Sequence, residues 1–86
     1  MNTFAEFYEA KVVRAEDLKR VLRDYAETGS SVRGNVVVAV INRTELTTTD
    51  KQELLESAQI GVKKQEKLLH PKEVQQYQII VRRLSC

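Results

Sequence analysis

Apolar residues recur every three or four positions over most of the chain, which is the spacing of amphipathic helices. The first such stretch runs from Thr3 to about Glu27. Thr3 and Glu6 have the spacing of a capping box, which favours a helix start at the N-terminus. Gly29 follows this stretch and can take the left-handed conformation that ends a helix. The pattern therefore predicts one long N-terminal helix.

The same residues allow a second interpretation. Tyr8 to Arg14 can be a strand that precedes a shorter helix over Ala15 to Glu27. Val12 and Val13 support this strand because β-branched side chains fit a pleated surface. The capping box at the N-terminus counts against it, so we favour the long helix.

A run of apolar residues from Asn35 to Asn42 breaks the helical pattern. It contains no charge, and four of its six central residues are valine. This composition predicts a strand. A lone strand leaves backbone N–H and C=O groups unpaired. Either a weak strand elsewhere pairs with it, or another chain does, or the run is a buried helix.

The C-terminal half predicts two helices. The first runs from Asp50 to about Leu69, with Thr49 and Gln52 at capping-box spacing and Gly61 placed where it can permit a close helix crossing. His70 precedes a proline and marks a boundary. The second helix runs from Pro71 to about Leu84. So short a connection is typical of an antiparallel helical hairpin.

These elements form one small domain over residues 1–86. At this length a domain buries roughly 60–65% of the surface that its unfolded chain exposes. The chain has five aromatic residues and no tryptophan, so the core consists mainly of aliphatic side chains. We expect a mainly α fold, either all-α or α+β. It has a long N-terminal helix, a central Val-rich strand-like segment and a C-terminal helical hairpin.

Charge, hydropathy and cysteine content indicate the cellular compartment of the protein. The net charge is +2, and basic and acidic residues are interleaved in both halves. No apolar run is long enough to cross a bilayer, and no signal sequence is recognisable. Cys86 is the only cysteine, so an internal disulfide is impossible. These features predict a cytoplasmic protein.

Candidate catalytic chemistry is sparse. His70 is the only imidazole, and no nucleophile motif lies near it. Metal sites need clustered ligands, whereas His70 and Cys86 are sixteen positions apart. The three glycines form no phosphate-binding pattern. We therefore expect no catalytic residue, no cofactor and no metal ion, and hence no enzyme activity.

Several apolar residues do not fit a single core, which favours a protein-binding function. Val13, Ile60 and Ile79 lie off the apolar stripes of their helices, and the Val-rich run has no obvious partner. An unpaired strand edge is usually covered or paired. We therefore expect an adaptor, inhibitor or small chaperone that binds another protein, a second copy of itself, or both. The expected contact residues are Val13, Val36, Val38, Val40, Ile60 and Ile79.

Nucleic-acid binding is the alternative function. Several basic residues gather near the connection of the C-terminal hairpin, and two more lie at the far end of its second helix. A basic edge of this kind can contact phosphates. Acidic residues are mixed in, and no aromatic residue is interleaved for base stacking. The residues concerned are Lys63, Lys64, Lys67, Lys72, Arg82 and Arg83.

Overall fold

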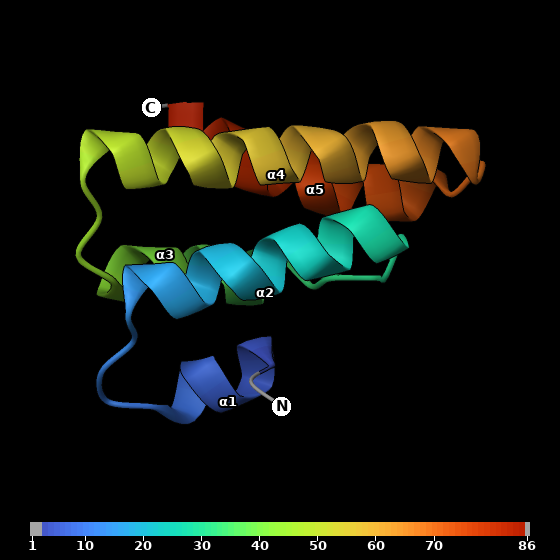
Figure 1. Cartoon of the computed structure of the whole chain (residues 1–86). Helices are drawn as coiled ribbons and strands as arrows, with labels where there is room; N and C mark the ends of the chain where they lie inside the picture. Colours follow the sequence, from blue (N-terminus) through green and yellow to red (C-terminus); the bar gives the residue numbers. More distant parts are fainter. Residues whose placement is uncertain (1–2, 86) are drawn as a thin grey trace.

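A computed structural model describes residues 3–85 of the chain, and this part forms five helices (Figure 1). The expectation of a mainly α fold is confirmed. The predicted central strand is wrong, because the structure has no strand within residues 3–85. The helices are α1 (Phe4–Glu9), α2 (Ala15–Thr28), α3 (Gly34–Arg43), α4 (Thr48–Lys67) and α5 (Pro71–Ser85).

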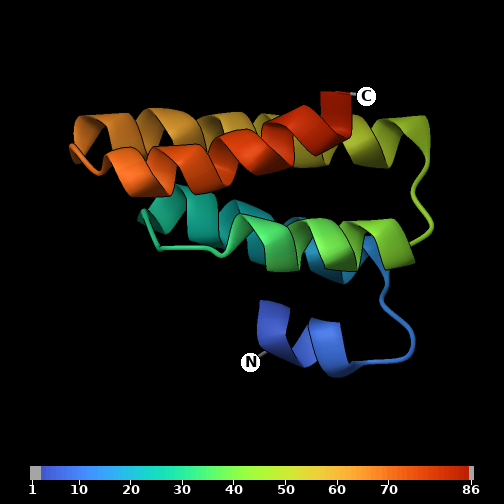
Figure 2. The same ribbon diagram turned by 180° about the vertical axis from the view of Figure 1, so that it is seen from behind.

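The helices are stacked in layers, and consecutive helices run in opposite directions (Figures 1 and 2). α4 and α5 form the predicted antiparallel hairpin. α2 packs on α4, and α3 packs on α5. α1 packs on α3 at the side away from the hairpin. Within residues 3–85, no helix is both long enough and apolar enough to span a bilayer.

The core lies between the two layers of long helices. Each of these helices contributes residues at i, i+3 or i+4 spacing, which places them on one face. Two buried aromatic residues of α1, Phe4 and Phe7, extend the core on the other side of α3. The residues without exposed surface include Leu18 and Leu22 of α2, Val37 and Val40 of α3, Leu54 and Ala58 of α4, and Tyr77 and Ile80 of α5.

The Val-rich run is the helix α3. Val37, Val40 and Ile41 have helical spacing and are all buried. Nearly every position of the run is apolar, so this periodicity is invisible in the sequence. Burial then outweighs the weak intrinsic preference of valine for strands. The helix also has a distant cap, because the Gln76 side chain accepts a hydrogen bond from the Gly34 N–H at 2.7 Å.

The predicted long N-terminal helix is also wrong. The capping box at Thr3 is present, but α1 ends at Glu9 and an extended segment leads to α2. An unbroken helix over residues 3–27 would be about 37 Å long, longer than the 35 Å molecule. The break lets α1 fold back on α3, where the Arg43 guanidinium donates hydrogen bonds to the Tyr8 and Ala10 carbonyls.

The alternative interpretation of this region is right for its helix and wrong for its strand. α2 begins at Ala15 as that interpretation states, but the segment before it pairs with nothing in a sheet. α2 ends at Thr28 and is followed by Gly29, which has a φ of 75° as expected from its position. The end of α2 is therefore set by the one residue type for which this conformation has no steric cost.

The start of α4 lies two residues before the predicted one. Thr47 and Asp50 form the capping box, in place of Thr49 and Gln52. Lys19 of α2 donates hydrogen bonds to Asp50 at 2.9 Å and Glu53 at 2.5 Å. The hydrogen bond to Glu53, followed by the one to Asp50, contributes most to raising the pKa of Lys19 to about 12. The hydrogen bond from Lys19 in turn lowers the pKa of the Asp50 carboxyl. The cluster joins the N-terminal halves of α2 and α4, which run parallel to each other (Figure 1).

The hairpin depends on a close contact between Gly61 of α4 and Tyr77 of α5. A Cβ atom on Gly61 would lie 2.3 Å from the Tyr77 ring carbons, so only glycine fits without a shift. The Tyr77 ring is fully buried, and its hydroxyl donates to the Ser30 carbonyl at 2.9 Å. The expected close helix crossing at Gly61 is confirmed.

We predict that Gly61→Ala destabilises the fold by about 1–3 kcal/mol, because the added methyl overpacks the crossing. In an ordinary helix the same change stabilises by up to about 1 kcal/mol. Urea unfolding of Gly61→Ala in the wild-type and Tyr77→Leu backgrounds measures both effects. The cost should vanish or reverse with leucine at position 77, and an equal cost in both backgrounds would contradict the close contact.

Candidate functional site

The connection between α4 and α5 combines a left-handed backbone residue with exposed apolar side chains. α4 ends in a Schellman motif, in which the His70 N–H donates to the Gln65 carbonyl at 3.1 Å and the Leu69 N–H donates to the Glu66 carbonyl at 3.2 Å. Leu69 occupies the left-handed position of this motif, with a φ of 58°. We name residues 68–72 the hairpin tip.

Leucine is an unfavourable choice at this position. It is the only non-glycine residue within 3–85 with a positive φ, and the equivalent position at the end of α2 is Gly29. The left-handed conformation costs a residue with a Cβ roughly 1–2 kcal/mol. Residues held in such conformations cluster at functional sites, so an observed case suggests a function for the side chain.

The strained backbone presents an apolar side chain to solvent. Leu69 is 84% exposed and its neighbour Leu68 is 44% exposed. Two shallow hollows of about 410 and 420 Å³ lie beside Leu69, and both include His70 and Pro71. The hairpin tip thus combines an apolar projection with two adjoining hollows.

A buried polar cluster fixes the hairpin tip to the rest of the fold. The Gln65 side chain has no exposed surface, and its amide donates to the Gly29 carbonyl at 2.8 Å. The side-chain oxygen of Gln65 forms a hydrogen bond with His70 Nδ1 at 3.1 Å. Buried polar groups that are fully hydrogen-bonded specify one arrangement. The hairpin tip is therefore held in position from beneath.

Two ionisable side chains of α5, Glu73 and Tyr77, are at least partly buried. Burial, with a smaller contribution from the Glu73 carboxylate, raises the pKa of the Tyr77 phenol above its ordinary value. One oxygen of Glu73 is buried without a hydrogen-bond partner in the described part of the chain. Glu73 also lines one of the hollows at the hairpin tip.

Positive charge collects around the hairpin tip. Residues 63–73 carry four lysines and two glutamates, which leaves ten basic and ten acidic residues in the rest of the chain. The whole net charge of +2 therefore lies in this segment. None of its lysines belongs to an ion pair with another residue of 3–85. The lysines are Lys63, Lys64, Lys67 and Lys72.

The structure does not bring all the predicted basic residues together. Arg82 lies ten positions after Lys72 on α5, about 15 Å further along the helix. Arg83 donates a hydrogen bond to the Asn42 side chain at 2.6 Å, at the opposite end of the molecule from the hairpin tip. Only the four lysines share a region.

The predicted protein-contact residues are spread over the molecule, and none is fully exposed. Val40 has no exposed surface, and Val36 and Val38 of the same helix are half-buried. Ile79 packs near the first turn of α3. The remaining two, Val13 in the segment before α2 and Ile60 on α4, are half-buried and pack against the core. Their role in binding stays a prediction, and the strand edge that motivated a dimer is absent.

Sequence reasoning missed the residues that the structure exposes. Leu69 has the spacing of the apolar stripe of α4, so the sequence places it in the core. In the structure α4 ends at Lys67, and the left-handed turn points Leu69 away from the stripe. The available signal was the lack of glycine before the His70–Pro71 boundary.

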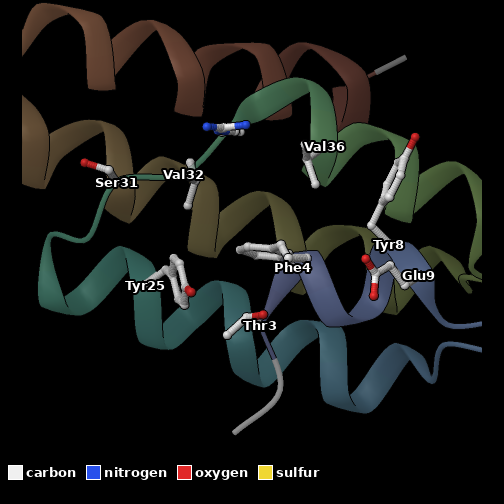
Figure 3. A pocket seen from close by; sticks show the side chains of 10 residues that line it. Thr3, Phe4, Tyr8, Glu9, Tyr25, Ser31, Val32 and Val36 are labelled. Atoms are coloured by element: carbon white, nitrogen blue, oxygen red, sulfur yellow. The ribbon is translucent and has the colours of Figure 1, made fainter.

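A third hollow lies beside α1 (Figure 3). It has a volume of about 310 Å³, and its lining comes from α1, the end of α2, the link to α3 and the first turn of α3. Phe4 and Tyr25 form an edge-to-face pair there, with ring centroids 5.1 Å apart. Val32 and Val36 complete a mainly apolar lining. The hollow suits an apolar side chain and contains no histidine or cysteine.

The described residues show no arrangement that favours catalysis or metal binding. His70 is engaged with Gln65, and no group of three potential metal ligands occurs within residues 3–85. Cys86 lies outside the described residues. No protein-family model matches the chain, and no curated protein or solved structure is significantly similar to it.

We predict that Leu69→Gly stabilises the protein by about 1 kcal/mol, because glycine removes the cost of the left-handed backbone. Leu69→Asn should be close to neutral, because asparagine tolerates this conformation, and Leu69→Ala should gain nothing. The midpoints of urea unfolding measure the series. A loss of stability in Leu69→Gly would show that the leucine side chain contributes to the fold.

Proposed function

We propose that this chain is a non-catalytic protein-interaction module that docks through the hairpin tip. One observation carries the proposal: Leu69 is held in a strained left-handed conformation and yet is 84% exposed. The Schellman motif that ends α4 requires a left-handed residue at this position, but it does not require a large apolar side chain there. A partner that buries Leu69 would recover roughly 1.5–3 kcal/mol of hydrophobic free energy.

The surroundings of Leu69 support docking on a protein. Gln65 and Tyr77 anchor the elements on either side of the hairpin tip, so the projection has a fixed shape. A preformed surface loses little conformational entropy on binding. The adjoining hollows can receive side chains of the partner, and four unpaired lysines favour an acidic rim on it.

A fluid membrane surface fits these features less well. Glu66 and Glu73 line the hollows beside Leu69 and would enter the membrane with it. Moving carboxylates out of water is costly unless they are paired. A rigid projection with matching hollows is also unnecessary for insertion between lipids.

Such a protein acts by occupying a surface of its partner, as an adaptor, an inhibitor or a small chaperone does. The lone imidazole is tied to Gln65, which supports a function without catalysis. We also propose that the protein acts in the cytoplasm. The single cysteine within these 86 residues supports that setting, because no internal disulfide can form.

Nucleic-acid binding is the weaker proposal, because Arg82 and Arg83 lie far from the four lysines. We predict no measurable binding to duplex DNA at physiological salt, since Glu66 and Glu73 lie among the lysines. An anisotropy titration over a salt series tests this. Tight binding with a log–log slope of roughly −3 to −4, as four phosphate contacts give, would favour the nucleic-acid function, provided that changing the lysines to glutamate abolishes it.

The docking proposal predicts that capture of proteins from the native source depends on Leu69. Wild type and Leu69→Met should retain the same protein, because both present a large apolar side chain. Leu69→Gly should lose it despite an intact and more stable fold. Quantitative mass spectrometry after nuclease treatment measures the three recoveries. Equal recovery with Leu69→Gly, or recovery that nuclease abolishes, would contradict docking through the hairpin tip.

A further inference from the structure

We infer that His70 makes the charge of the hairpin tip depend on pH, while the buried polar cluster beneath it keeps the shape of the tip unchanged. His70 is the only histidine of the chain, and it is exposed between Leu69 and Pro71. This property belongs to the free protein, so it holds whether or not a partner binds.

The hydrogen bonds of Gln65 determine which ring nitrogen of His70 carries a proton. The Gln65 amide nitrogen lies 2.8 Å from the Gly29 carbonyl oxygen and 3.4 Å from the Ser30 carbonyl oxygen. Carbonyl oxygens only accept hydrogen bonds, so the NH₂ group of the amide must face them. The side-chain oxygen of Gln65 therefore faces His70, at 3.1 Å from Nδ1.

Nδ1 must then be the donor, because an amide oxygen also only accepts. Gln65 has no exposed surface, so water does not replace this donor. An unprotonated Nδ1 would place two acceptors against each other in a buried site, which is unfavourable. Neutral His70 is therefore held as the Nδ1–H tautomer, and a further proton can be added only at Nε2.

Nε2 is available for that proton. It has no hydrogen-bond partner within the part of the chain that the structure describes, and the His70 side chain is exposed. A proton at Nε2 keeps the hydrogen bond from Nδ1 to Gln65 and makes it charge-assisted, which strengthens it. The four lysines and two glutamates of residues 63–73 give a net charge of +2, and protonated His70 raises it to +3.

The groups around His70 come from both helices of the hairpin and from the link between α2 and α3. The charged residues that line the same hollows are Glu66 of α4 and Lys72 and Glu73 of α5. The link contributes Ser31, which carries no charge. Burial raises the pKa of Tyr77, so its hydroxyl keeps its proton and its hydrogen bond to the Ser30 carbonyl. Among unperturbed side chains, only histidine changes its charge between about pH 5 and 8.

Nitrogen-15 NMR of the wild-type protein, prepared without a histidine tag, measures the two ring nitrogens of the single imidazole. At about pH 8 we expect a protonated Nδ1 and an unprotonated Nε2. On acidification to about pH 5, Nε2 should gain a proton while the amide–Hα coupling of Leu69 stays that of a left-handed residue. A protonated Nε2 at pH 8, equal populations of the two tautomers, or a change of the Leu69 coupling with pH would overturn the inference.

The added charge also affects binding, and this step rests on the proposed docking function. On an acidic rim, protonated His70 should strengthen capture of the Leu69-dependent protein. His70→Asn is the matched control, because its amide can donate in place of Nδ1 but does not titrate.

Capture from the native source at about pH 6 and pH 8 compares wild type with His70→Asn, which cancels titration of the partner itself. The ratio of the two recoveries should be about two- to fivefold higher at pH 6, which is the effect of one exposed ion pair. An equal ratio at both pH values would contradict a contribution of His70 to docking. Recovery of no Leu69-dependent protein would contradict the docking function alone, because the NMR measurement needs no partner.

Discussion

The crossing of α4 and α5 at Gly61 and Tyr77 is the contact on which the rest of the molecule depends. Because Gly61 has no side chain, the Tyr77 ring reaches the backbone of α4 and lies wholly within the core. Its hydroxyl then reaches across to the Ser30 carbonyl in the link between α2 and α3. One residue thereby joins both layers of the fold.

The same end of the molecule carries the feature that suggests a function. Gln65, one turn after Gly61 on α4, binds the Gly29 carbonyl and His70, so the end of α2 and the hairpin connection share one buried polar cluster. Above this cluster the chain holds Leu69 in a left-handed conformation and exposes it. The firm packing beneath is what allows a strained, apolar projection to persist at the surface.

The spacing of apolar residues and the positions of proline and glycine predict two parts of this fold. The C-terminal hairpin follows from the stripe of α4, the boundary at Pro71 and the small Gly61, and the end of α2 follows from Gly29. The helical form of the Val-rich run α3 could not be predicted, because an almost uniformly apolar run has no readable period. Its helical form depends on burial between α1 and α5.

The break after α1 and the docking surface depend on tertiary contacts. The segment after Glu9 leaves the helix because Arg43, more than thirty positions away, binds the freed carbonyls and α1 packs on α3. Leu69 has core spacing in the sequence, and only the Schellman motif turns it outward. Three of the residues predicted to bind a partner, Val13, Ile60 and Ile79, lie off the apolar stripe of their own segment, and the other three belong to the Val-rich run that the sequence predicts as a strand. Their burial depends on neighbouring helices, which a single stripe does not reveal.

Solution NMR of the wild-type protein measures whether the hairpin tip is a fixed projection. If it is, the backbone chemical shifts and the amide–Hα coupling of Leu69 report a left-handed residue. The His70 amide, which donates to the Gln65 carbonyl, then also exchanges slowly with solvent. Averaged shifts at Leu69 together with unprotected exchange at His70 would instead place the leucine on a mobile loop.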